Sequence, residues 1–115
     1  MFDVDFYRLE NGVAPVEAFL DGLDPKMRNK AVRSLELLET FGNNLREPNS
    51  KSLGDGLFEL RIKFSSDITR IFYFFAIKNK IILTNGFVKK TAKTPREEIE
   101  KARKYKADYE RRYGQ

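Results

Sequence analysis

Three apolar stretches follow one another closely in the centre of the chain, and their spacing limits the possible folds more than any other feature. We expect β-strands near residues 57 to 64, 68 to 77 and 80 to 88, separated only by "SSD" and "KN". Connections this short join neighbouring antiparallel strands, because a parallel pair needs a long crossover. The centre of the chain is therefore predicted to be an antiparallel β-meander.

The N-terminal third predicts one strand followed by two helices. "FDVDFYRL" alternates apolar and polar residues, which is typical of a strand with one face in water. The first helix starts behind Pro15, and the second opens at Asp24-Pro25 and stops at Gly42. We expect the two helices to form a helical hairpin.

The segments on either side of the meander have clear signals of their own. "GNNLREPNSKSLGDG" is rich in turn-forming residues and predicts a loop, with a short strand near 51 to 53. "TPREE" has the pattern of a capping box, with Thr94 as N-cap, Pro95 at the first helical position and Glu97 three residues after the cap. A C-terminal helix should run from there to about Tyr113. The expected fold is a single α+β domain covering residues 1–115.

The composition excludes several kinds of chemistry. The chain of 115 residues has no cysteine and no histidine, so any catalysis must use Lys, Arg, Asp, Glu or Tyr, and we expect no metal site and no cofactor. No apolar run approaches the roughly 18 residues of a membrane span. The N-terminus is acidic, the reverse of a signal peptide, so we expect a cytoplasmic protein that does not bind membranes.

Positive charge is concentrated in the predicted meander. The net charge of the chain is +5, and residues 57–94 hold eight Lys or Arg against two Asp or Glu. Residues 1–42 have the opposite balance, five against eight. A concentrated basic region favours a polyanionic partner, and nucleic acid is the best candidate. The alternative is that the charge serves only solubility.

The cations fall on one face of the predicted sheet. Side chains alternate along a strand, so Glu59, Arg61 and Lys63 share one face. An even-length turn would place Arg70 opposite Arg61, and a two-residue turn at Lys78-Asn79 would then set the position of the third strand. The resulting face would hold Arg61, Lys63, Arg70, Phe87 and Lys89 at a basic end and Phe72, Phe74 and Leu83 at an apolar end.

Like charges on neighbouring strands repel by a few tenths of a kcal/mol per pair, so such a cluster suits a site that binds an anion. Arginine can bind a phosphate through two parallel hydrogen bonds. The alternative is that long Arg and Lys stems merely cover the sheet. On an open face, truncating Arg70 would change stability by no more than about 0.5 kcal/mol.

"LFELRIKFSSDITRIFYFF", followed by "GFVKKTAKTPREEIEKA", resembles the HigB-type branch of the RelE/ParE toxin superfamily, a group often labelled phage-derived or host-inhibition-like toxins. The resemblance extends over nearly the whole chain, and its most specific pieces are "ELR", "RIFYFF" and "GFVKKT.KTP". It implies a RelE-like fold. The superfamily includes ribosome-dependent messenger RNA endonucleases, gyrase poisons and inactive relatives.

The resemblance implies the toxin of a type II toxin-antitoxin system. HigB and RelE members inhibit translation by cutting messenger RNA in the ribosomal decoding site, without a metal. The implied partners are the ribosome, messenger RNA and a HigA-like helix-turn-helix antitoxin. The alternatives are a ParE-like gyrase inhibitor and an inactive nucleic-acid-binding relative.

Site residues follow from the same resemblance. Arg61 and Lys63 match paired basic positions of the first meander strand, Arg70 matches an arginine that opens the next, and Lys89 or Lys90 matches the basic residue that ends the last. Arg70 and Lys89 or Lys90 are implied as phosphate clamps, and Lys63 as a proton-transfer group. The chain has neither a histidine nor a clear tyrosine after "FVKKT", which leaves Lys63 and Glu59 as candidate bases, while Tyr73 is expected in the core. The expected RNA-binding set is Arg61, Lys63, Arg70, Phe87, Lys89, Lys90 and Lys93.

Overall fold

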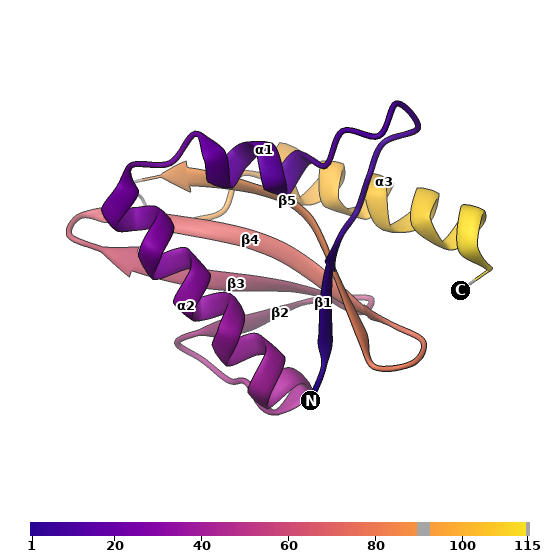
Figure 1. The fold of residues 1–115 in the computed structure, drawn as a ribbon, viewed down its shortest axis with the longest axis horizontal. Helices are drawn as coiled ribbons and strands as arrows, with labels where there is room; N and C mark the ends of the chain where they lie inside the picture. Colours follow the sequence, from indigo (N-terminus) through magenta and orange to yellow (C-terminus); the bar gives the residue numbers. More distant parts are fainter. Residues whose placement is uncertain (90–92, 115) are drawn as a thin grey trace.

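One five-stranded sheet with helices on both faces makes up the protein (Figure 1). The computed structural model describes residues 1–89 and 93–114. The strand order is β1-β5-β4-β3-β2, and the predicted α+β class and antiparallel meander of β3, β4 and β5 are confirmed. The elements are β1 Asp3–Phe6, α1 Pro15–Asp21, α2 Pro25–Phe41, the 3₁₀ helix η1 Gly42–Asn44, β2 Ser50–Gly54, β3 Leu57–Phe64, β4 Asp67–Ala76, β5 Lys80–Lys89 and α3 Arg96–Tyr113.

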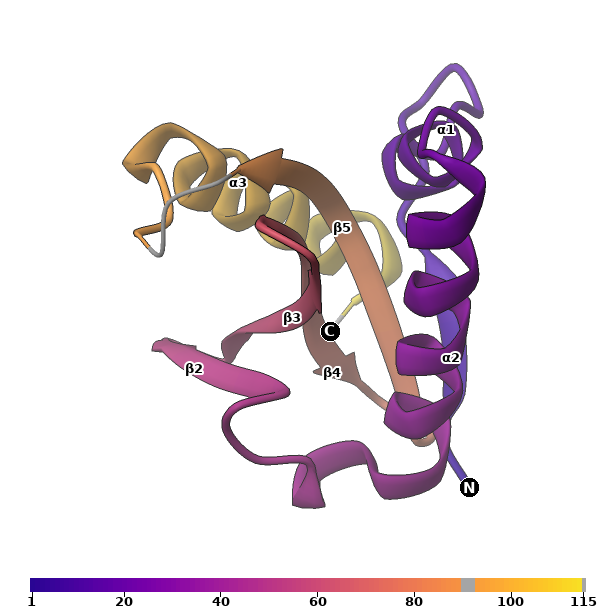
Figure 2. The same cartoon turned by 90° about the vertical axis from the view of Figure 1, so that its left-hand side faces the viewer.

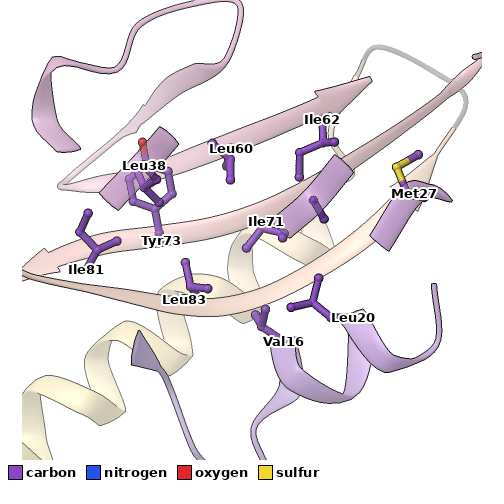
Figure 3. Packing of buried hydrophobic residues seen from close by; sticks show 11 residues of the cluster. Val16, Leu20, Met27, Leu38, Leu60, Ile62, Ile71, Tyr73, Ile81 and Leu83 are labelled. Atoms are coloured by element: carbon purple, nitrogen blue, oxygen red, sulfur yellow. The ribbon is translucent and has the colours of Figure 1, made fainter. Parts of the chain in front are cut away.

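The sheet separates two helical layers, with α1 and α2 on one face and α3 on the other (Figure 2). The larger core lies against α1 and α2, where Ile71, Tyr73 and Leu83 of the strands form one cluster with side chains of both helices. Figure 3 shows Tyr73 beside Leu38 of α2, and Val16 of α1 near Leu83. On the opposite face, the strands pack against α3 through two smaller clusters. Because helices cover both faces of the sheet, the second part of β4, residues 71–76, is an unbroken apolar run rather than an alternating one.

The helix signals of the N-terminal third are confirmed. α1 begins at Pro15, and α2 follows Asp24, whose side chain accepts a hydrogen bond from the backbone N–H of Lys26 at 3.1 Å. α2 ends before Gly42, which has a φ of 49°. A Cβ at that position would lie 2.0 Å from the ring of Phe2, so only glycine fits both the conformation and the space.

The predicted capping box at Thr94 is wrong. α3 begins at Arg96 with Pro95 as its N-cap residue, and no side chain caps it. The hydroxyl of Thr94 instead donates a hydrogen bond of 2.5 Å to Oε1 of Glu59. A buried carboxylate needs hydrogen-bond donors more than an exposed helix end needs an acceptor, because water can satisfy the helix end.

The predicted register of the first hairpin is confirmed. Arg61 lies opposite Arg70, and Leu60 lies opposite Ile71. β1 had no predicted partner, and in the structure it pairs in parallel with β5. The short strand expected near 51 to 53 is β2, which pairs with the first part of β3 and ends the sheet on that side.

The second hairpin differs from the prediction in two ways that cancel. Ala76 pairs with Lys80, so the turn has three residues rather than two. A β-bulge then places two residues of β5, 84 and 85, opposite Phe72 alone. Leu83 therefore lies opposite Tyr73 in the α1 and α2 layer, and its predicted place on the basic face is wrong. Beyond the bulge, Phe87 lies opposite Arg70, as predicted.

A polar network fixes the C-terminal part of α3 to the end of β1. The hydroxyl of Tyr7, which is buried, donates a hydrogen bond of 2.7 Å to Asp108, and Arg112 donates one of 2.9 Å to the same oxygen. Arg111 also binds Asp108, and the ring of Tyr7 stacks on Tyr105. The hydrogen bond from Tyr7, followed by those from the arginines, lowers the pKa of Asp108 to about 2.

We expect Asp108→Asn to lower the melting temperature at neutral pH. The pKa of Asp108 is depressed in the folded state, so its ionised form contributes stability above its ordinary pKa of 3.8, and this contribution is lost as the pH falls through about 2. The difference in melting temperature between wild type and variant should therefore narrow as the pH is lowered from 5 toward 2. Asp55→Asn, at a side chain that is 93% exposed, is the control and should change little. A constant difference across this range would contradict the assignment.

Candidate nucleic-acid interface

Two rows of residues cross the three central strands at one end of the face on which α3 packs. One row joins Arg61, Arg70 and Phe87, and the next joins Lys63, Ile68 and Lys89. Residues paired across strands point to the same side of a sheet, so both rows belong to the face on which α3 packs. At the other end of this face, α3 packs over a cluster of Leu57, Phe72 and Ala102. The predicted division into a basic end and an apolar end is therefore present.

Arg70 is not on the surface, and the prediction of an exposed phosphate clamp at this position is wrong. Its side chain is 0% exposed. Its Nε atom lies 3.6 Å from Oε2 of Glu59, and its guanidinium carbon lies 5.6 Å from the centre of the Phe87 ring. Burial lowers the pKa of the Arg70 guanidinium, and the Glu59 carboxylate opposes this shift. Because an arginine still keeps its proton, Arg70 is a buried cation that needs its partners.

Glu59 is the anion of this cluster. It is only 1% exposed, and its Oε2 lies 3.0 Å from Nε of Arg61 as well as near Arg70. Its Oε1 accepts the hydrogen bond from Thr94. A general base needs a lone pair that a substrate proton can reach, whereas both oxygens of Glu59 are engaged by the protein. The geometry therefore fits Glu59 as a structural counter-ion better than as a base.

The remaining predicted cations lie further out. Lys63 and Lys89 are exposed at the edges of the second row, and the Arg61 side chain is 25% exposed. Phe87 is half-buried, with its ring stacked on Phe72. Lys93 is exposed, and Lys90 lies outside the described residues. The accessible part of the site therefore consists of Arg61, Lys63 and Lys89 around Ile68, above a buried layer that includes Arg70 and Glu59.

A groove beside the end of β3 adds two cations that the sequence did not indicate. It has a volume of about 590 Å³ and lies between α2, the loop after η1 and the last residues of β3. Lys30 and Arg33 of α2 belong to it, and both lie in a short basic segment, residues 25–35, within the N-terminal third of the chain whose total charge is negative. The groove is lined by Lys30, Arg33, Ser34, Leu37, Pro48, Asn49, Arg61, Ile62, Lys63 and Ile68.

The described residues hold no group of three or more Asp or Glu side chains that could bind a metal ion. Within residues 1–89 and 93–114, no helix is both long and apolar enough to cross a membrane.

We expect Arg70→Ala to destabilise the fold strongly. The substitution leaves Glu59 buried with one cation fewer and opens a cavity beside Phe87, and breaking a buried ion pair from one side costs about 3–5 kcal/mol. Lys63→Ala is the matched control, because Lys63 is exposed one row away and should change stability by no more than about 0.5 kcal/mol. Urea denaturation measures both free energies of unfolding. Equal midpoints for the two variants would contradict the buried role of Arg70.

Comparison with known proteins places the chain in a family. None of the curated proteins is similar enough to count as a match. The model of one family, described as phage derived protein Gp49-like (DUF891), matches residues 18–107. The match runs from within α1 into α3 and includes the basic cluster and the groove. This family is toxin-like and related to the RelE/HigB-type toxins. The match covers well over half of the sequence, and the chain therefore belongs to the phage-derived Gp49-like family.

Proposed function

We propose that the protein is the toxin of a type II toxin-antitoxin system, an endoribonuclease that cuts messenger RNA on the ribosome without a metal and so stops translation in the cytoplasm. The observation that carries this proposal is the group formed by the exposed Lys63 and Lys89 and the partly exposed Arg61 at one end of the sheet. Membership in a family related to the RelE/HigB-type toxins supports it. Its proposed partners are the ribosome, messenger RNA and a HigA-like helix-turn-helix antitoxin.

In the proposed reaction, a ribose 2′-oxygen attacks its own 3′-phosphate. The bond from the 2′-oxygen to phosphorus forms, the bond from phosphorus to the 5′-oxygen breaks, and the products are a cyclic phosphate and a 5′-hydroxyl. The 2′-hydroxyl loses a proton and the leaving 5′-oxygen gains one. Cations near the phosphorus stabilise the charge that builds up on its oxygens.

The structure suggests different roles for the inner and outer cations. Lys63 and Lys89 lie on either side of Ile68 and are accessible, so they can bind the phosphate and, in the case of Lys63, exchange a proton. Arg61 is partly exposed and can bind a phosphate oxygen. Arg70 is a positioning residue in this scheme, because it acts through the Glu59 carboxylate that it shares with Arg61.

We expect Lys63→Ala and Lys89→Ala each to slow cleavage of ribosome-bound messenger by roughly 100-fold or more, because each removes a charge that stabilises the transition state. Primer extension on messenger from ribosomes incubated with purified protein measures the cleavage rate. Lys104→Ala, an exposed lysine on α3, is the control and should cut like wild type. Both site variants should keep the melting temperature of wild type. Full activity in both would remove these lysines from the mechanism.

We also expect strong cleavage of ribosome-bound messenger and little cleavage of the same RNA when it is free. The chain has no histidine, so little of the rate can come from a base suited to neutral pH. Orientation must supply the rest, and holding reacting groups in line can be worth roughly 7–11 kcal/mol. A messenger fixed in the decoding site is held in this way, and a free strand is not. EDTA at concentrations that spare the ribosome should have no effect.

Two results would count against this function. Efficient cutting of free single-stranded RNA would refute the dependence on the ribosome while leaving a ribonuclease in place. Expression in cells distinguishes a ribonuclease from a gyrase poison. With a ribonuclease, translation should stop before any DNA damage signalling begins. DNA damage signalling before any loss of translation would overturn the proposal.

A further inference from the structure

The groove between α2 and β3 has positive charge on two sides of an apolar floor. Lys30 and Arg33 come from α2, and Arg61 and Lys63 come from β3. Among the described residues that line it, none is Asp or Glu. We propose that this groove binds the segment of single-stranded RNA next to the phosphate that is cut. The inference deepens the proposed function and rests on it for the cleavage step, but RNA binding in the groove can be tested without cleavage.

The two cations of α2 are well placed for this role. They are three residues apart, so they lie on the same side of the helix. The Nζ atom of Lys30 donates a hydrogen bond of 2.8 Å to the backbone oxygen of Lys63 and lies 5.6 Å from the centre of the Phe64 ring. These contacts hold the ammonium group at the edge of β3, where it still has two donors for a phosphate. For Lys30, these contacts reduce the side-chain freedom that is lost on binding.

The floor of the groove suits the bases of a single strand. Leu37, Pro48, Ile62 and Ile68 supply apolar surface, and Ser34 and Asn49 supply polar groups. Proteins that bind single-stranded RNA combine a positively charged groove along the phosphates with aromatic side chains on which the bases stack. In this groove, aliphatic side chains take the place of the aromatic ones and offer van der Waals contact to the bases. The volume of about 590 Å³ lies within the usual range of roughly 300–1,000 Å³ for ligand pockets.

The backbone of β3 favours RNA over a peptide strand. A peptide that binds a sheet edge needs free backbone N–H and C=O groups. At this edge, the N–H of Arg61 already donates to the backbone oxygen of Asn49 at 2.8 Å, and the C=O of Lys63 already accepts from Lys30. These two pairing groups are therefore already bonded within the protein, whereas the lining of the groove is made mainly of cationic and apolar side chains.

Arg61 and Lys63 belong both to the groove and to the basic rows of the sheet. An RNA strand whose phosphate is bound at the two rows can therefore extend into the groove and stay next to cationic side chains along its whole path. The arrangement gives the protein contacts to more than one phosphate of the same strand.

The test is the salt dependence of binding to a fluorescently labelled single-stranded RNA of about a dozen nucleotides. Each phosphate contact on a single strand contributes about 0.7 to the slope of log affinity against log salt between about 50 and 200 mM KCl. We expect the double variant Lys30→Ala/Arg33→Ala to bind more weakly, with a slope about 1.4 smaller in magnitude than that of wild type. The matched control is Lys26→Ala/Lys104→Ala, which removes two exposed lysines outside the groove and should keep the wild-type slope.

Arg33→Ala alone serves as a second variant if the loss of the Lys30 contacts disturbs the fold, and its slope should fall by about 0.7. An unchanged slope in a folded groove variant, or no binding of the RNA by wild type, would overturn the proposal. A third result would also overturn it. If wild type binds an acidic peptide instead of RNA, and the groove variant does not bind this peptide, the groove is the site of a protein partner. A wild-type protein that binds RNA through the groove but cuts no ribosome-bound messenger would refute the proposed function and leave the groove as an RNA site.

Discussion

The buried carboxylate of Glu59 is the contact on which the arrangement of the basic face depends. It joins Arg61 of its own strand, Arg70 of the neighbouring strand and Thr94 ahead of α3. An arginine without a partner could not remain buried beside Phe87, because a buried charge is stable only when it is paired and hydrogen-bonded. The same carboxylate fixes the segment that leads into α3, so the ion cluster and the position of the helix depend on each other.

The three central strands and the register of the first hairpin can be predicted from the sequence, because residues two apart share a face and the short turn leaves few alternatives. The second hairpin shows the limit of this reasoning. A three-residue turn and a bulge at 84 and 85 are both invisible in the apolar pattern. Their offsets cancel beyond the bulge, which is why Phe87 and Lys89 lie where a simple two-residue turn would put them while Leu83 does not.

The site was less predictable than the fold, because its details depend on contacts between distant segments. The number of cations in the central strands suggested an open, solvated face. Glu59, however, lies two residues before Arg61 on the same face, and its carboxylate neutralises part of their positive charge. Thr94 binds Glu59, which lies 35 residues earlier in the sequence, so the local motif around Thr94 could not indicate this contact. Lys30 and Arg33 join the basic region only because α2 packs beside the end of β3.

The internal position of Glu59 has a consequence for which anions the protein can bind. A carboxylate on the same chain is held next to Arg61 and Arg70 by the fold, so it does not lose the translational freedom that a dissolved chloride or phosphate ion loses on binding. Small anions therefore compete poorly for these arginines. In the proposed function, a polymer that is already held through neighbouring contacts gains the same advantage of tethering, and its phosphate can approach the partly exposed Arg61. The buried carboxylate would then favour long polyanions over small ones.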